Sequence, residues 1–201
     1  MKIVLVNTAD INGGAARAAY RLHGALLNAG VDSKMLVQAK ASDDYTVIAN
    51  ETKIQKGLAK LRPTLDSLPV KFYKNRTKTL FSPAWLPSLG LAERINALNA
   101  DVVHLHWINA GMLRIEELAK INAPIVWSLH DIWAFTGGCH YDENCEGYKQ
   151  RCGHCKVLTS LKENDLSRRI HNRKSKAFQR IENLTIVGLS QWLANCAKQS
   201  P

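Results

Sequence analysis

The chain has 201 residues, of which 46% are hydrophobic and 22% are charged, and its formal net charge is +10. This composition is typical of a soluble globular protein with one large core, and no apolar run approaches the roughly 20 residues that a membrane-spanning helix needs. The first residues predict a strand rather than a signal peptide. We therefore expect a single cytoplasmic domain, in which disulfides are disfavoured and clustered cysteines favour a metal.

Positive charge is concentrated in two stretches of the sequence. Residues 53–78 contain eight Lys or Arg and one acid, Asp66, and residues 161–180 contain seven Lys or Arg with Glu163 and Asp165. Such charge suits an anionic partner: phospholipid head groups, a phosphorylated substrate or nucleic acid. A solvated helix face with a disordered basic loop explains the pattern equally well.

The first forty residues predict a βαβ unit. An apolar strand over 2–6 leads into a polar, glycine-ended turn over 7–14. Apolar residues at helical spacing over 15–28 then predict a helix that ends at Gly30, and a second strand follows over 33–38. This order implies a parallel sheet with right-handed crossovers.

The rest of the chain continues this alternation after a less regular segment. That segment contains a short strand over 46–49 and a basic amphipathic helix over 53–61, and four prolines from Pro63 to Pro87 predict that no long element follows. Beyond it we expect helices over 91–98, 115–121, 164–181 and 191–198, and strands over 101–106, 125–129 and 184–189. The sequence thus predicts an α/β fold.

Polar groups gather where the predicted strands end, and ligands of open α/β sheets bind at such positions. Gly13 and Gly14 let backbone N–H groups approach a phosphate or a sugar, although a plain tight turn has the same sequence. His106 and His130 each end an apolar strand, and Asp131 can set the tautomer of His130 or bind a hydroxyl. A packed, hydrogen-bonded role for His106 fits the sequence as well as a ligand role.

Four of the five cysteines lie in a loop over 136–156. Cys152 and Cys155 form a C-x-x-C knuckle, a spacing that lets two thiolates face one tetrahedral metal. We predict a structural zinc that fixes a polar loop with too few apolar residues to fold by burial. Free thiols, a redox pair, an iron–sulfur cluster and disulfides remain open as alternatives. The predicted zinc ligands are Cys139, Cys145, Cys152 and Cys155, with His140 or His154 as substitutes.

Four segments together resemble bacterial glycosyltransferase family 4: KIVLVNTADINGGAARAAYRLHGAL, DVVHLHW, WSLHDIWAFTGGCHY with its cysteines, and IVGLSQWL. More narrowly, they look like the exopolysaccharide-type members that carry a TGGCHY cysteine loop. The resemblance implies the GT-B fold, in which two Rossmann-like halves with parallel sheets and helices on both faces meet across a cleft. It also implies retaining transfer of a sugar without a catalytic metal.

The same resemblance implies roles for individual residues. Gly13 and Gly14 would form the loop near the donor phosphate and the acceptor. His130 would contact the transferred sugar, with Asp131 beside it as the second catalytic candidate. The predicted substrate-binding residues are Gly13, Gly14, Arg17, His106, Trp107 and Thr136.

Residues 1–201 resemble the amino-terminal, acceptor-side half alone, with no counterpart of the carboxyl-terminal donor domain. We expect this chain to be inactive by itself, because half of the cleft would be missing. The implied partners are a nucleotide-sugar donor, a saccharide or lipid-linked acceptor in polysaccharide synthesis, and the other domain. An anionic surface at the inner membrane face and self-association are further expectations.

Two other functions fit parts of the sequence. A zinc-stapled basic module for nucleic acid fits the charge and the cysteines, but the aromatic residues do not interleave with the basic stretches as a stacking platform requires. A dinucleotide-dependent enzyme fits the sheet, but the third glycine of its fingerprint is missing after Gly14. The glycosyltransferase interpretation is therefore favoured.

Overall fold

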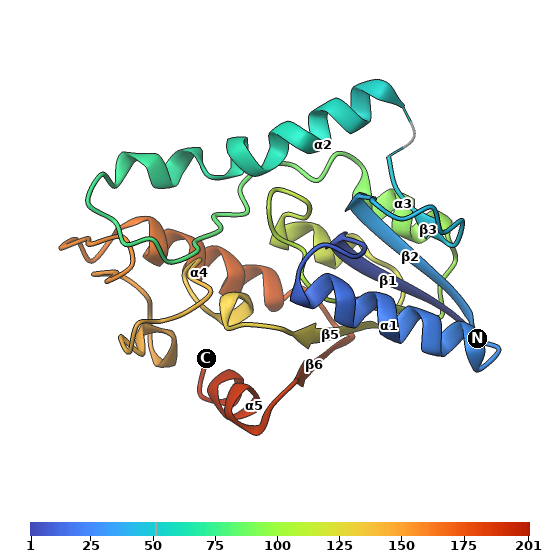
Figure 1. Ribbon diagram of the computed structural model, residues 1–201. Coiled ribbons are helices and arrows are strands. Elements are labelled where there is room, and N and C mark those ends of the chain that lie inside the picture. Colours follow the sequence, from blue (N-terminus) through green and yellow to red (C-terminus); the bar gives the residue numbers. More distant parts are fainter. Residues whose placement is uncertain (51) are drawn as a thin grey trace.

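The computed structural model describes residues 1–50 and 52–201, and a six-stranded parallel sheet forms its centre (Figure 1). The strands are β1 (Lys2–Ala9), β2 (Asp32–Ala39), β3 (Val47–Ile48), β4 (Val102–Leu105), β5 (Ile125–Leu129) and β6 (Leu184–Gly188). Their order is β3-β2-β1-β4-β5-β6, and every neighbouring pair is parallel. This is the order of a doubly wound, Rossmann-like sheet, so the predicted fold class is confirmed.

Helices cover both faces of the sheet, because alternate strand residues point to opposite sides. In β1, Ile3 and Leu5 belong to the apolar cluster that includes residues of α1 (Gly14–Asn28), whereas Val4 and Val6 belong to a larger cluster. The helices that contribute to the larger cluster are α3 (Leu91–Ala97), α4 (Leu166–Phe178), α5 (Gln191–Lys198) and the 3₁₀-helices η2 (Ile115–Lys120) and η3 (Trp133–Phe135). None of the helices in the described residues is long and apolar enough to cross a membrane.

The helix α2 (Lys53–Asp66) and the 3₁₀-helix η1 (Leu68–Phe72) run along the margin of the molecule, at the top of Figure 1. The sequence predicted that this helix ends near residue 61, with Pro63 as a breaker, and that prediction was wrong. Pro63 lies inside α2, and its carbonyl accepts a hydrogen bond from the backbone N–H of Ser67 at 3.2 Å. A proline costs the helix one backbone donor, but it leaves the following turns intact.

Other element boundaries also differ from the sequence prediction. The strand β1 continues through the buried Asn7 and Thr8, which were predicted to begin the turn. The segment η2 is a 3₁₀-helix rather than an α-helix, and α4 is shorter than the predicted helix over 164–181. The start of α4 is fixed by Asp165, whose side chain accepts a hydrogen bond from the N–H of Arg168 at 3.0 Å.

Candidate functional site

An open cleft of ≈ 520 Å³ lies beyond the carboxyl ends of β1 and β4. These two strands are neighbours at the centre of the sheet, where the strand order reverses, and ligands of doubly wound sheets bind at this switch point. The walls include the turn after β1, Trp107 after β4, and the segments after β5. The lining includes Asn7, Gly13, Gly14, Trp107, His130, Asp131, His140 and Tyr141.

The amino end of α1 opens directly into the cleft. Gly13 is the N-cap at φ 102°, a conformation that favours glycine, and no side chain caps the helix within the described part of the chain. The first bond of the helix runs from the N–H of Arg17 to the carbonyl of Gly13 at 3.1 Å. The N–H groups of residues 14–16 therefore remain free for the oxygens of a ligand, and the helix dipole favours a negative one.

The turn that leads into α1 is held by Asp10, a residue that the sequence analysis did not single out. Its carboxylate is fully buried and accepts backbone hydrogen bonds from Ile11 at 2.9 Å, Ala41 at 3.0 Å and Ser42 at 2.8 Å. Burial raises the pKa of Asp10, but these hydrogen bonds outweigh it and hold the pKa below its usual value. The ionised Asp10 thus fixes the turn after β1 to the turn after β2.

His130 lies in the cleft with its ring orientation fixed from behind. Its Nε2 shares a hydrogen bond with Nδ1 of His106 at 2.9 Å. Burial, together with the neighbouring His104 and His130, lowers the pKa of His106 to about 3. Burial also lowers the pKa of His130, against the raising influence of Asp131, so both rings are neutral at pH 7.

The two predicted histidines therefore occupy different positions. His106 is only 5% exposed and lies behind His130 instead of lining the cleft, which corrects the expected position on the acceptor side. Its Nε2 has no hydrogen-bond partner among the described residues. Of these two, His130 alone lines the cleft, and its Nδ1 makes no hydrogen bond within residues 1–50 and 52–201.

Asp131 lines the cleft, but the protein already occupies its oxygens. Its Oδ2 accepts hydrogen bonds from Nε1 of Trp107 at 3.1 Å and from Nδ1 of His140 at 2.6 Å, and its Oδ1 accepts one from the N–H of Trp133 at 2.8 Å. Burial raises the pKa of Asp131, but the hydrogen bonds, first of all that from His140, bring it below its ordinary value. Asp131 is thus an ionised carboxylate that orients the rings around it.

Ser82, His140 and Asp131 stand in the order of a catalytic triad. The Nε2 of His140 hydrogen-bonds Oγ of Ser82 at 2.8 Å, and the Nδ1 bonds Asp131. However, Ser82 and His140 are 5% and 1% exposed, and Ser82 is not among the residues that line the cleft. A nucleophile must reach its substrate, so we interpret this series as a positioning network.

Two predicted substrate-binding residues lie away from the cleft. Arg17 is on the exposed surface of α1, and its side chain is not part of the lining. Thr136 is buried, and its hydroxyl donates to the carbonyl of Cys139 at 2.6 Å and accepts from the N–H of Gly138 at 3.3 Å. Thr136 therefore shapes the cysteine loop.

The cysteine loop is held in part by burial, contrary to the sequence prediction. Cys139 and Cys155 pack with apolar neighbours, and all five cysteines are free thiols. The other members of this cluster are Val70, Phe81, Val157, Leu158 and Ile170. In the part of the chain that the structure describes, no group of three or more His, Cys, Asp or Glu side chains is placed to hold a metal ion. The predicted zinc thus has no support from these positions and remains a prediction.

A buried lysine joins the loop to α4. Nζ of Lys174 donates hydrogen bonds to the carbonyls of Trp133 and Thr136 and lies 3.5 Å from the ring centroid of Trp133. Burial lowers the pKa of Lys174 to about 7. Because these contacts fix the segment after β5, Lys174 helps to hold the wall that carries His130 and His140.

Sequence reasoning missed several residues of the cleft, among them Asn7, His140 and Tyr141. Oδ1 of Asn7 accepts a hydrogen bond from the N–H of Trp107 at 2.7 Å and so joins the ends of β1 and β4. His140 was considered only as a substitute metal ligand, and Tyr141 was not considered. The signal for Asn7 was its place directly after an apolar strand, but nothing in the sequence showed that the strand continues through it.

Comparison with known proteins relates the sequence to one described family. The model of the family described as Glycosyltransferase Family 4 matches residues 12–189, a range that contains the glycine turn, Trp107 and His130. The chain is 26% identical over 165 residues to the Escherichia coli K12 protein named putative colanic acid biosynthesis glycosyl transferase WcaC. The aligned region covers 80% of this chain and 40% of that relative. No solved structure gives a significant match.

Proposed function

The chain belongs to glycosyltransferase family 4, and we propose that residues 1–201 form the acceptor-side domain of a retaining enzyme. This enzyme would move a sugar from a nucleotide sugar to a saccharide or lipid-linked acceptor. The observation that carries the proposal is the cleft at the switch point, which the start of α1 and His130 both line. The relative is named for colanic acid biosynthesis, which favours a role in polysaccharide synthesis for this chain.

The start of α1 suits the charged part of the donor. Three free N–H groups at a helix amino end favour phosphate oxygens, and Gly14 has no atom within 4 Å of the place where a side chain would begin. A phosphate can thus approach the backbone closely. In this proposal the glycine turn faces the donor phosphate and the edge of the acceptor.

His130 suits a contact with a sugar hydroxyl. The neutral ring is fixed by His106 through Nε2, which leaves Nδ1 to exchange one hydrogen bond with the transferred sugar. Asp131 acts through Trp107 and His140 as a positioning residue, because its oxygens already accept three hydrogen bonds. The proposal assigns no metal to the catalytic step.

Transfer requires both substrates in one geometry. The chain spans 40% of the length of the curated relative that it matches. We therefore propose the transfer activity for an enzyme that contains this domain together with a donor domain. We expect residues 1–201 to bind the acceptor at the cytoplasmic face of a membrane. We also expect that they do not complete the transfer without a facing donor domain. The alternative of a zinc-stapled nucleic-acid module finds no support in the described side chains.

Ligand binding to the cleft tests this proposal. We expect short hexose oligosaccharides and nucleotide sugars to shift the NMR signals of the Trp107 indole and the His130 ring, and His130→Ala to abolish the saccharide response. Tyr45→Ala serves as the control, because Tyr45 is 89% exposed and is not among the residues that line the cleft. If none of these ligands shifts a signal of the cleft, the proposal is wrong. If residues 1–201 alone transfer a labelled sugar from a nucleotide sugar to an acceptor, the assignment as an acceptor-side domain is wrong.

A further inference from the structure

The segment formed by α2 and η1 carries a continuous apolar stripe that faces solvent. The stripe consists of five residues spaced alternately by four and three positions: Ile54, Leu58, Leu61, Leu65 and Leu68. At about 100° per residue these side chains fall within an arc of about 80°, so they lie on one side of the segment. Their exposed fractions run from 39% for Leu68 to 77% for Ile54, and Phe72 extends the spacing at 86%.

The contacts that hold α2 to the protein come from a different side of the helix. Ala59 and Asp66 are the buried residues of α2. Asp66 accepts backbone hydrogen bonds from Ala84 and Trp85, at 3.3 and 3.2 Å, and Nε of Arg62 donates to the carbonyl of Gly111 at 2.6 Å. A surface helix normally turns its apolar side to the core. Here polar anchors hold the helix, and the apolar stripe is left for a partner.

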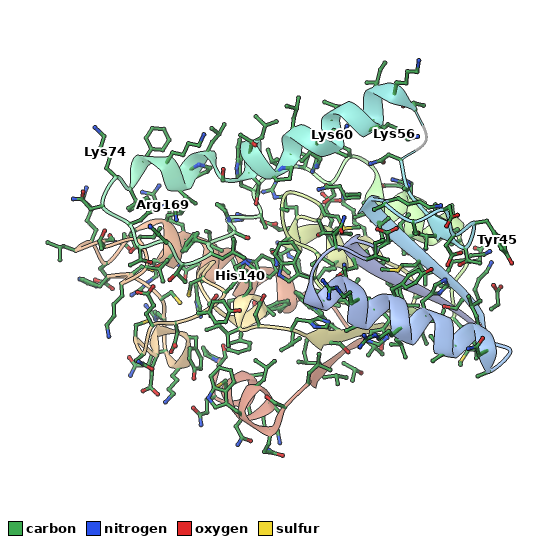
Figure 2. All side chains as sticks on the ribbon, viewed as in Figure 1. Tyr45, Lys56, Lys60, Lys74, His140 and Arg169 are labelled. Carbon is green, nitrogen blue, oxygen red and sulfur yellow. The ribbon has the colours of Figure 1, made fainter. Side chains whose placement is uncertain are left out.

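The charge of the segment shows which kind of partner fits. Within residues 53–78 the sequence has eight Lys or Arg, and its one acid, Asp66, is buried. The lysines of the segment are exposed: Lys53, Lys56, Lys60, Lys71, Lys74 and Lys78. Figure 2 shows Lys56 and Lys60 along α2, with Lys74 beyond its far end. A partner of this surface must therefore be both apolar and anionic.

We propose that α2 and η1 form a docking face for an anionic lipid bilayer. A helix with an apolar stripe and lysines on its polar side lies in the membrane interface, with the stripe at the acyl boundary and the ammonium groups at the phosphates. Nucleic acid would leave the stripe unused, because single strands stack on aromatic rings, whereas the stripe consists of the aliphatic side chains of Ile54 and four leucines. Two copies of this face would repel each other.

The docking face lies at the same edge of the sheet as the cleft. Leu58 and Arg62 share a small cavity with Gln38 at the carboxyl end of β2, and the cleft lies at the carboxyl ends of β1 and β4. A docked molecule thus presents this edge near the lipid surface. The use of that arrangement for a lipid-linked acceptor rests on the proposed function, whereas the docking itself does not.

Vesicle co-sedimentation of the 201-residue protein tests the docking face. We expect binding to vesicles of phosphatidylcholine with phosphatidylglycerol, weaker binding at high salt, and none to phosphatidylcholine alone. The triple variant Ile54→Ser/Leu61→Ser/Phe72→Ser should bind about tenfold or more weakly, because three large apolar groups no longer enter the bilayer. Its melting temperature should match the wild type, since these side chains are exposed.

Two matched controls distinguish binding through this face from nonspecific binding to vesicles. Tyr45 and Leu161 are 89% and 93% exposed, so Tyr45→Ser/Leu161→Ser removes apolar surface elsewhere and should leave vesicle binding unchanged. Lys53→Gln/Lys56→Gln/Lys60→Gln should weaken binding more than Arg169→Gln/Lys176→Gln/Arg180→Gln, which removes equal charge from the exposed side of α4 and its end.

Three results would overturn the proposal: no binding to anionic vesicles, equal losses in a variant and its control, or salt-sensitive binding of RNA in place of vesicles. Saccharide binding in the cleft is measured separately by NMR. Failure of docking with an intact saccharide response therefore rejects the docking face and leaves the proposed function standing. Vesicle docking without any saccharide response in the cleft rejects the proposed function and leaves the docking face standing.

Discussion

At the scale of single residues, the three histidines at the ends of β4 and β5 divide into one that faces a ligand and two that stand behind it. His130 lines the cleft, His106 holds its ring, and His104 bonds Oγ of Ser128 at 2.9 Å. All three have pKa values lowered by burial. Neutral rings can both donate and accept, which suits the recognition of sugar hydroxyls more than the binding of an anion.

The His106 to His130 hydrogen bond gives a residue-scale prediction. His106→Phe keeps an aromatic ring but removes the bond, so the ring of His130 should turn freely and saccharide affinity should fall up to about tenfold, the effect of one lost hydrogen bond. His104→Phe is the matched control, because His104 does not bond His130. NMR titration of the His130 ring and of saccharide binding measures both. Equal affinity in the two variants would show that His106 does not position His130.

At the scale of elements, close backbone contacts fix the cysteine loop against α4. A Cβ atom on Gly137 would lie 2.4 Å from the carbonyl oxygen of Ser167 and 2.8 Å from Cβ of Cys152. We expect Gly137→Ala to lower the free energy of unfolding by about 3 kcal/mol, because neither neighbour can move without shifting backbone.

A second glycine provides the comparison. Gly24 lies inside α1, and no neighbouring segment comes within 4 Å of the place where a Cβ atom would stand. Gly24→Ala should therefore raise the free energy of unfolding by about 1 kcal/mol, the difference in helix propensity between the two residues. Urea unfolding of both variants measures the contrast. A neutral Gly137→Ala would mean that the loop does not pack on α4 as described.

The thiols of the cysteine loop give a second prediction at this scale. Cys145 is half-buried, whereas Cys139, Cys152 and Cys155 are buried. Burial raises the pKa of Cys152 to about 12, which disfavours its reactive thiolate. We expect a maleimide to modify Cys145 first and the other three only after unfolding.

Elemental analysis of the same sample decides the zinc prediction. About one zinc per chain, with four thiols released by a chelator, would establish a tetrathiolate site. Uniform reactivity of all four thiols in the native, metal-free protein would contradict both the zinc and the buried packing.

The elements also show how far the sequence alone was predictive. Apolar periodicity gave the order of strands and helices and hence the parallel sheet, because each element buries a face. It failed at Asn7, where a polar residue stays in a strand since its side chain bonds the neighbouring strand end. It failed at Pro63, where tertiary anchors hold the helix. The glycines and His130 were found at the cleft, whereas the positions of His106 and Thr136 depend on packing between segments distant in sequence.

At the scale of the whole molecule, buried neutral histidines make stability depend on pH. Five histidines have pKa values lowered first of all by burial: His23, His104, His106, His130 and His171. In the unfolded chain each of these rings has a pKa near 6.5 and binds a proton that it does not bind in the folded state. Their contribution is thus complete above about pH 6.5 and is lost as the pH falls below it.

We therefore expect the free energy of unfolding to fall by about 2 kcal/mol or more between pH 7 and pH 5, at up to about 1.4 kcal/mol per pH unit for each proton. Carboxylates with lowered pKa values, such as Glu116 at about 2, act below this window, because unfolded carboxyl groups titrate near pH 4. Lys174, with a pKa of about 7, adds only a small loss just below pH 7, so the loss between pH 6 and pH 5 belongs to the histidines. His106→Phe removes the most depressed of them and should flatten the slope measured by urea unfolding. If the free energy of unfolding of the wild type stays constant from pH 7 to pH 5, these rings take up protons within the fold as they do in the unfolded chain. His130 would then not stay neutral, and the proposed sugar contact requires a neutral ring.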